Sequence, residues 1–336
     1  MVNSDGPQFV TLGLFIIDEF EFRDEAGKPT GRDQRSQIGG GGTYAVLGAR
    51  MWLPPDKIGM IVDRGYDFPG EIREQLLEYG EAMWMFRDQP QCKTTRALNL
   101  YYGEHRDFKY LTDRIRLTPR DIERTRLGRP RSLHFTCSPN RAAQIIAEID
   151  EVDGWNPTII YEPIPDSCVP ENLPALKEVL LRVNVLSPNA EEALNLLSLS
   201  LPPTKSTIQQ AAHMFLECGV GARGNGAVII RSGELGAFVQ TRSKNSAWVD
   251  AYWTESKHVV DVTGAGNSFL GGLAAGLVEA NGDMAATLYA TVSASFAIEQ
   301  EGLPTLSPNE QDPERPHWNG DSPRRRLADL RARLDK

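Results

Sequence analysis

Short hydrophobic runs alternate with amphipathic segments along most of the chain. Runs rich in Val, Ile and Phe are typical of buried strands, whereas apolar positions that recur every three or four residues indicate helices. The strand-like runs lie at 9–17, 58–62, 132–136, 158–162, 183–187 and 227–231. Helical patterns lie between them at 70–80, 142–149 and 175–181, and another begins near residue 189. This alternation predicts an α/β protein with a central, mostly parallel sheet and helices on both of its faces.

Two segments depart from this pattern, at about 18–39 and 92–111. Each alternates polar with apolar or aromatic side chains, and each contains a turn-forming stretch, "EAGKPTG" in the first and "GEHRD" in the second. Alternation of this kind is typical of strands that have one face in water. We therefore expect two hairpins that project from the main sheet and form a small β-lid over a site at its carboxyl edge.

Charge and composition narrow the functional classes. The chain has 336 residues and a net charge of −9, which argues against a broad nucleic-acid-binding surface. It contains no apolar run near the roughly 18 residues that a membrane span needs, and the opening "MVNSDGPQFV" lacks the pattern of a signal peptide. We therefore expect a cytoplasmic protein with neither a membrane nor a nucleic-acid partner.

Cysteine and histidine give no sign of a metal or disulfide framework. The four cysteines are far apart and the five histidines are scattered along the chain.

Near the C terminus, Leu327, Leu330 and Leu334 recur at helical spacing. This spacing predicts an amphipathic helix over about 322–335 that packs on the body, a reading favoured over a basic docking patch.

The stretch "VVDVTGAGNSFLGG", at 259–272, carries the most specific chemistry. Two valines indicate a short strand, Gly264, Ala265 and Gly266 form a turn, and an apolar helix follows. The N–H groups at a helix start, together with the positive end of its dipole, favour phosphate oxygens. A tight turn without a ligand is the alternative. The segment is neither a GxxxxGK[ST] loop nor a GxGxxG motif, since Phe269 stands where the last glycine would be.

The segment "DVTGAGNSFLGG" resembles the C-terminal signature of the PfkB/ribokinase family of ATP-dependent small-molecule kinases. That signature has an aspartate, the catalytic base, where this chain has Asn267. The resemblance implies an anion hole for the transferring phosphoryl group, formed by Gly264, Ala265, Gly266 and the N–H of Asn267. It also places Asp261 and Thr263 near a site for a monovalent cation, K⁺.

Two further segments resemble the parts of the family that bind the phosphoryl acceptor. In "TLGLFIID", Asp18 matches a substrate-binding aspartate at the root of the lid, although by itself it also fits the start of a charged edge strand. "IGGGGTYAVLGAR" resembles the glycine-rich substrate segment, for which a flexible turn is the alternative. Its candidate residues are Gly40, Gly41, Gly42 and Thr43. The family usually has a substrate-binding Asn where Thr43 and Tyr44 stand, so we expect Tyr44 to narrow or reshape a sugar pocket.

The nucleotide side resembles the family through two motifs. "LSPNAEEA" matches its N-x-x-E motif, through which Asn189 and Glu192 would act on phosphate and on the hydration of Mg²⁺. The same pair also fits a helix N-cap and its partner three residues later, a capping box. "IIRSGELGAFV" resembles the nucleotide segment, with Ser232, Gly233 and Gly236 at a turn that by itself fits an ordinary hairpin.

The expected function follows from this resemblance and from the amide at position 267. An amide cannot accept a proton at neutral pH, and a positioned general base is worth about 10²- to 10⁴-fold in rate. We therefore expect a single kinase domain over 1–336 that uses ATP and Mg²⁺ to phosphorylate a hydroxyl of a sugar or polyol-like molecule at a reduced rate.

Two alternatives stay open, namely a nucleotide-binding pseudokinase that acts through partners and a kinase of a non-sugar metabolite. Asn267 and the "GGGGTY" segment together resemble a fungal branch of the family related to the maintenance-of-killer proteins. The resemblance also leads us to expect a homodimer formed through the lid.

Overall fold

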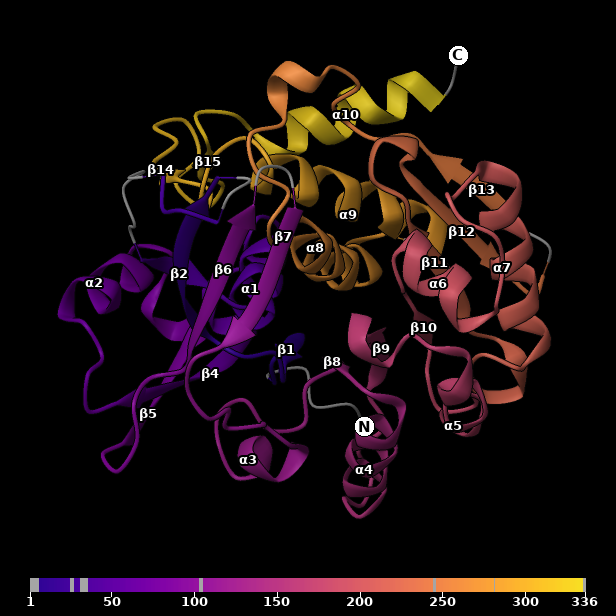
Figure 1. Cartoon of the computed structure of the whole chain (residues 1–336), viewed down its shortest axis with the longest axis horizontal. Coiled ribbons are helices and arrows are strands. Elements are labelled where there is room, and N and C mark those ends of the chain that lie inside the picture. Colours follow the sequence, from indigo (N-terminus) through magenta and orange to yellow (C-terminus); the bar gives the residue numbers. More distant parts are fainter. Residues whose placement is uncertain are drawn as a thin grey trace.

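The computed structural model describes residues 6–24, 27–30, 36–102, 105–243, 246–280 and 282–334. Within these residues a nine-stranded sheet runs through the molecule in the order β13-β12-β11-β10-β9-β8-β1-β4-β5 (Figure 1). Neighbouring strands are parallel except at the β11–β12 and β12–β13 pairs. The strands span Phe9–Thr11 (β1), Ile58–Gly65 (β4), Trp84–Gln89 (β5), Ser132–Cys137 (β8), Thr158–Pro163 (β9), Val185–Leu186 (β10), Ala227–Arg231 (β11), Ala237–Thr241 (β12) and Ser246–Val249 (β13).

Helices cover both faces of this sheet, as the hydrophobic pattern predicts. Successive strand residues point to opposite faces, so Phe9 and Val10 belong to different hydrophobic clusters. On one face lie α1 (Gly41–Arg50), α2 (Gly70–Glu78), α8 (Ala265–Glu279), α9 (Asp283–Ala297) and α10 (Pro323–Leu334). On the other lie α3 (Pro119–Glu123), α4 (Pro139–Asp150), α5 (Leu173–Leu180), α6 (Ala190–Leu196) and α7 (Lys205–Glu217). The predicted α/β architecture is confirmed.

A second, smaller sheet forms the lid. Its order is β3-β2-β6-β7, with strands Gln37–Gly39 (β3), Ile16–Arg23 (β2), Arg96–Tyr102 (β6) and His105–Tyr110 (β7). Both hairpins are antiparallel, and β2 pairs with β6 in parallel, which makes the lid a mixed sheet. The lid is thereby confirmed, although the turns expected at 25–31 and 103–107 lie partly outside the described residues.

The run at 9–17, expected to be one strand, is two strands in different sheets. The chain leaves the main sheet after Thr11 and enters the lid at Ile16. Gly13 lies between them, against the backbone of Gly42, where a Cβ on Gly13 would stand 2.6 Å from the Gly42 nitrogen. The bend is therefore built around a close approach of two backbones that only glycine allows.

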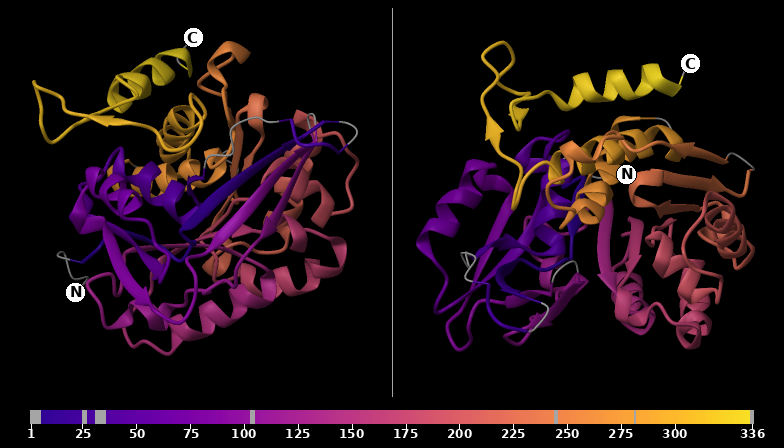
Figure 2. Two further views of the ribbon diagram at one scale, coloured as in Figure 1. Left: turned by 60° about the vertical axis from the view of Figure 1, so that its left-hand side comes forward. Right: turned by 45° about the horizontal axis from the view of Figure 1, so that its top comes forward.

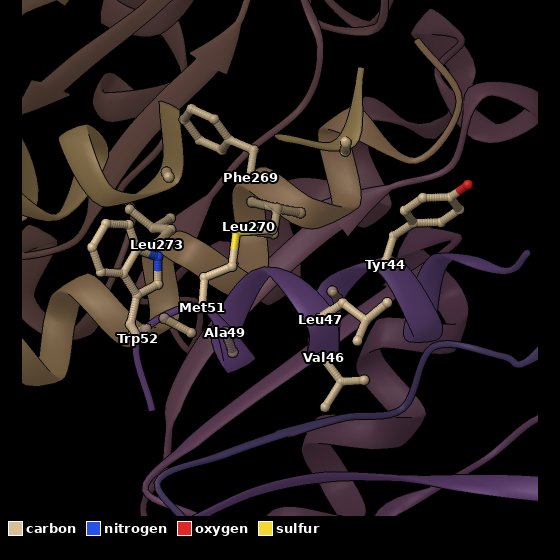
Figure 3. Packing of buried hydrophobic residues seen from close by; sticks show 14 of the residues in the cluster. Tyr44, Val46, Leu47, Ala49, Met51, Trp52, Phe269, Leu270 and Leu273 are labelled. Atoms are coloured by element: carbon tan, nitrogen blue, oxygen red, sulfur yellow. The ribbon is translucent and has the colours of Figure 1, made fainter. Parts of the chain in front are cut away.

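Helices α1 and α8 touch at their backbones (Figure 3). A Cβ on Gly48 would lie 2.1 Å from the carbonyl oxygen of Ser268, and one on Gly271 would lie 1.7 Å from that of Ala45. Around this contact, Leu47 of α1 packs with Leu270 of α8 in the larger hydrophobic cluster. The glycines of α1 and the glycine turn before α8 are therefore held in a fixed relation.

The strand order places a ligand site at the middle of the sheet. From β1 the chain continues outward to β4 and β5, and it then returns to β8 on the other side of β1. In open α/β sheets, ligands bind at the carboxyl ends of the strands where the order reverses in this way. Here that edge lies under the lid and beside the start of α8 (Figures 1 and 2).

The C-terminal helix α10 lies along α9 at the outer surface of the molecule (Figure 2). Leu327 and Leu330 are buried there, and the guanidinium of Arg326 is also buried, 3.6 Å above the ring of Phe296. A two-stranded sheet of β14 (Leu306–Ser307) and β15 (His317–Trp318) precedes α10. No helix formed by the described residues is both long and apolar enough to cross a membrane.

Candidate active site

Two pockets flank the start of α8 at the carboxyl edge of the main sheet. The larger, of about 790 Å³, is lined by six residues that the sequence assigns to phosphate or nucleotide, Asn189, Ser232, Gly233, Gly236, Ala265 and Gly266. The smaller, of about 190 Å³, includes Gly13, Gly41 and Tyr110. A Cβ on Gly41 would lie 3.1 Å from Nδ2 of Asn267, the residue that follows Gly266. Position 267 therefore lies where the two pockets approach each other.

The glycine turn presents backbone N–H groups to the larger pocket. Gly264 takes the left-handed conformation, with φ 77°, and a Cβ there would overlap the Tyr44 ring. The N–H of Ala265 donates to the carbonyl of Val262 at 3.2 Å, so this donor is already engaged in the present arrangement. The N–H groups of Gly266 and Asn267 lie in the first turn of α8, where a helix supplies no partner. They are the donors that an anion would meet.

The segment before this turn is not the short strand expected from its valines. The N–H groups of Val260 and Asp261 both donate to the carbonyl of Ile298, at 2.7 and 3.3 Å. Residues 259–262 are thus bonded to the end of α9, and none of them forms a strand in the described chain. The side chains of Val260 and Val262 are exposed.

Asn267 is hydrogen-bonded to a buried carboxylate that the sequence analysis did not single out. Its Nδ2 donates to Oε2 of Glu162 at 2.8 Å, and Oε1 of Glu162 lies 2.7 Å from Nη2 of Arg231. Burial alone would raise the pKa of Glu162, but the Arg231 guanidinium and His134 outweigh it and hold that pKa below its usual value. Glu162 is therefore ionised at neutral pH, and it fixes the orientation of the amide.

Glu162 and Arg231 share a sequence signal that could have found them. Each is a charged residue close to the carboxyl end of a buried parallel strand, β9 and β11 respectively. Thr11 is an uncharged polar residue in the same position, at the carboxyl end of β1, and its Oγ1 lies 2.9 Å from Nδ1 of the buried His134. Polar residues at that end of a parallel strand point to the site edge rather than to the core.

Asn189 and Glu192 form the capping box that was the alternative to a magnesium role. Asn189 Oδ1 accepts from the N–H of Glu192 at 2.8 Å, and Glu192 Oε2 accepts from the N–H of Asn189 at 2.7 Å. Burial raises the pKa of Glu192 to about 7, against the opposing effect of Arg231. The carboxyl group is therefore partly protonated at neutral pH, and it is committed to the helix start.

The described residues contain no cluster of three or more His, Cys, Asp or Glu that could hold a metal ion. Magnesium commonly binds through one or two carboxylates, water and substrate phosphates. The loop at Asp261 and Thr263 suits a monovalent cation, since Thr263 Oγ1 is buried and has no hydrogen-bond partner within the described chain.

The acceptor residues proposed from the sequence occupy the root of the lid and the start of α1. Asp18 is buried in β2, with its carboxylate against Gly39, and Gly40 has a positive φ of 94° before α1 begins at Gly41. Thr43 is fully buried, so a ligand does not reach its hydroxyl in this arrangement.

The expectation that Tyr44 reshapes the acceptor pocket is wrong. Its ring packs on Gly264, and Tyr44 is absent from the lining of the smaller pocket. The physical reason is that α1 already begins at Gly41, so helical geometry turns position 44 toward α8.

Comparison with known proteins identifies the family. The model for the pfkB family carbohydrate kinases matches residues 9–310. An uncharacterized protein of Schizosaccharomyces pombe is 33% identical over 341 residues, which cover 96% of this chain and 92% of that protein. Protein MAK32 of Saccharomyces cerevisiae is 34% identical over 335 residues, which cover 93% of this chain and 88% of MAK32. The chain belongs to the pfkB family of carbohydrate kinases, and this membership indicates an ATP-dependent phosphotransferase.

The fold agrees with that assignment. The structure of Arabidopsis thaliana ribokinase complexed with ribose and ATP superimposes with a TM-score of 0.68, covering 97% of this chain and 98% of the ribokinase. The two sequences are 16% identical. At that identity the likeness shows the ribokinase-like fold, with its large, mostly parallel sheet and its small mixed lid.

Proposed function

We propose that this protein is an attenuated kinase that transfers the γ-phosphoryl group of ATP to a hydroxyl of a small molecule, with the whole chain acting as one kinase domain. The observation that carries the proposal is the position of Asn267 between two pockets. Gly266 lines the larger pocket, and the side chain of Asn267 lies against Gly41 of the smaller one. A phosphoryl group passing from one pocket to the other has to cross this point.

The proposed roles divide between the two sides. Ser232, Gly233 and Gly236 would line the nucleotide site, and the N–H groups of Gly266 and Asn267 would bind the oxygens of the transferring group. Asp18, with the backbone of the glycine segment, would position the acceptor hydroxyl. Mg²⁺ bound with the triphosphate would neutralise phosphate charge, contacted by Glu192 through water.

Attenuation follows from the chemistry of the amide. Phosphoryl transfer draws most of its acceleration from positioning and electrostatic stabilisation, which backbone donors supply without a base. The Asn267 amide donates to Glu162, which leaves its carbonyl oxygen to orient a hydroxyl but not to remove its proton. A slow transfer is therefore expected, reduced by about 10²- to 10⁴-fold relative to a site with a base.

A nucleotide-binding pseudokinase is the second candidate, and one observation favours it. The carboxylate in contact with Asn267, that of Glu162, is also paired with Arg231. A carboxylate engaged in this way would not take a proton from a hydroxyl, whereas the N–H groups of Gly266 and Asn267 would still bind phosphate. This candidate shares the nucleotide pocket with the kinase and differs from it in turnover.

Calorimetry with ATP and Mg²⁺ tests the property that both candidates share. Gly266→Val should weaken ATP binding by at least about tenfold, because a Cβ at this position would already lie 2.0 Å from Nη1 of Arg231. Gly70→Val is a matched control, since a Cβ there meets no atom within 4 Å, and it should bind ATP as the wild type does. Wild-type protein without measurable ATP affinity would refute both candidates.

A further inference from the structure

The smaller pocket carries positive charge and no lining carboxylate. Its charged lining residues are Arg114, Arg116 and Arg141. None of the three guanidinium groups forms an ion pair within the described part of the chain. Cys137 also lines the pocket, but burial raises the pKa of its thiol to about 12, so it adds no negative charge at neutral pH. The pocket that faces position 267 is therefore electropositive.

Arg141 and Arg114 are held by contacts that leave their charge unneutralised. Nη2 of Arg141 donates to the main-chain carbonyls of Arg116 and Leu117, at 3.3 and 3.1 Å, which ties α4 to the segment before α3. The guanidinium of Arg114 lies 4.3 Å from the centre of the Tyr110 ring, at the end of lid strand β7. Arginine is suited to oxyanions because its planar group donates several hydrogen bonds in a fixed geometry.

The start of α4 also favours an anion in the smaller pocket. Ser138, the N-cap of this twelve-residue helix, lines the pocket, and the first turn of α4 contains no acidic residue. The positive end of the helix dipole is thus directed toward the pocket without a compensating side chain. Burial raises the pKa of Tyr110, so its phenol stays protonated and able to donate a hydrogen bond.

We propose that the small molecule bound beside position 267 is an anion, a hydroxylated metabolite that carries a phosphate monoester or a carboxylate, and that Arg114, Arg116 and Arg141 bind this group. The proposal deepens the proposed function, on which it rests for the identity of the pocket as the acceptor site. A neutral sugar would leave the three guanidinium groups that line this pocket of about 190 Å³ without an anionic partner. An acceptor with one anionic group supplies that partner and keeps a hydroxyl free.

Matched pairs of neutral and anionic ligands test the preference for an anion in a binding measurement, which does not depend on turnover. Calorimetry of the full chain, with a non-hydrolysable ATP analogue and Mg²⁺, would compare ribose with ribose 5-phosphate, and glucose with glucose 6-phosphate and gluconate. We expect at least one anionic ligand to bind at least tenfold more tightly than its neutral counterpart. That advantage should shrink when NaCl rises from 0.05 to 0.5 M. The phosphate and carboxylate arms distinguish the two sources of charge.

Substitution of the pocket arginines tests whether they cause the preference for anionic ligands. Arg116→Gln removes an exposed guanidinium and leaves the main-chain carbonyl that Arg141 uses, so we expect a normal melting temperature and about tenfold weaker binding of the anionic ligand. Arg114→Gln should act in the same direction. Arg131→Gln, an exposed arginine at the opposite end of β8, is the matched control and should change nothing.

Two results would overturn the inference. One is a panel in which no anionic ligand binds more tightly than its neutral partner. The other is an anionic preference that Arg116→Gln and Arg114→Gln both leave intact. ATP affinity is measured separately, so a protein that fails to bind ATP but shows an arginine-dependent anion site would refute the kinase and support this inference.

Discussion

Exchanging the two side chains that meet between the pockets tests whether the missing base limits the reaction. Asn267→Asp alone places a carboxylate where Nδ2 now lies 2.8 Å from Oε2 of Glu162. The swap Asn267→Asp with Glu162→Gln keeps one amide and one carboxylate in contact and moves the charge to position 267. Arg231 keeps an oxygen acceptor at position 162 in the double variant.

The distance between the two side chains sets how far the carboxyl pKa differs between the single variant and the swap. Two carboxylates roughly 4 Å apart repel by about 4 kcal/mol at an effective dielectric constant of about 20, which corresponds to about three pKa units. In the single variant one of the two groups should therefore titrate near pH 7, somewhat lower where Arg231 offsets the repulsion. In the swap the single carboxylate faces an amide and stays ionised across the neutral range.

Phosphoryl transfer measured as a function of pH separates these cases. The assay follows labelled phosphate from ATP to the acceptors used for binding, with mass spectrometry to exclude deamidation of Asn267. The swap should exceed the wild type by about 10²-fold, with little change between pH 6 and 8. The single variant should gain about tenfold in rate between pH 6 and 8 as the shared proton is lost.

Two outcomes would refute this reasoning. A level pH profile for Asn267→Asp would show that Glu162 is not coupled to position 267. No gain in either variant, with ATP affinity preserved, would show that proton removal does not limit turnover, and the pseudokinase would then be the better account. Glu162→Gln alone is the control, since it removes the carboxylate without supplying a base.

Two further predictions concern the carboxylates of Asp18 and Glu192. Asp18→Ala should weaken acceptor binding about tenfold in calorimetry while ATP affinity stays within twofold; equal loss of both ligands would indicate a disordered lid instead. Glu192, whose pKa is raised to about 7 by burial, binds a proton in the folded state that the unfolded chain releases above pH 4.5. The free energy of unfolding should therefore fall by about 3 kcal/mol as pH rises from 4.5 to above 7, and Glu192→Gln should lack this decline in urea unfolding at pH 5 and 8. Parallel pH profiles for the two proteins would contradict the assignment.

The architecture could be predicted because its core strands are almost wholly apolar. Runs such as 58–62 and 227–230 have no polar face, which is typical of a parallel sheet covered on both sides. The turn at Gly264 was predicted from its small residues before an apolar helix, and the structure shows why glycine is needed there, since Gly264 has a positive φ and packs on the Tyr44 ring. Local patterns with one physical solution were predicted correctly.

The contacts that join distant segments could not be predicted. Glu162, Arg231 and Asn267 come from three separate elements, and their hydrogen bonds depend on how the strands are ordered. The valines at 259–262 have strand propensity, yet the partner they use is a helix end. Arg116 and Arg141 likewise meet only because α4 packs beside the segment before α3.

The backbone contact between α1 and α8 limits how this site can change. No side chain separates Gly48 from Ser268 or Gly271 from Ala45, so no change of side-chain size can move the two helices further apart or closer together without breaking their packing. The lid and the segments after β1 and β8 line the smaller pocket, so its shape depends on them and not on the spacing of these helices. The distance between the glycines of α1 and the turn before α8 is thus set by main-chain contact, whichever side chain stands at position 267.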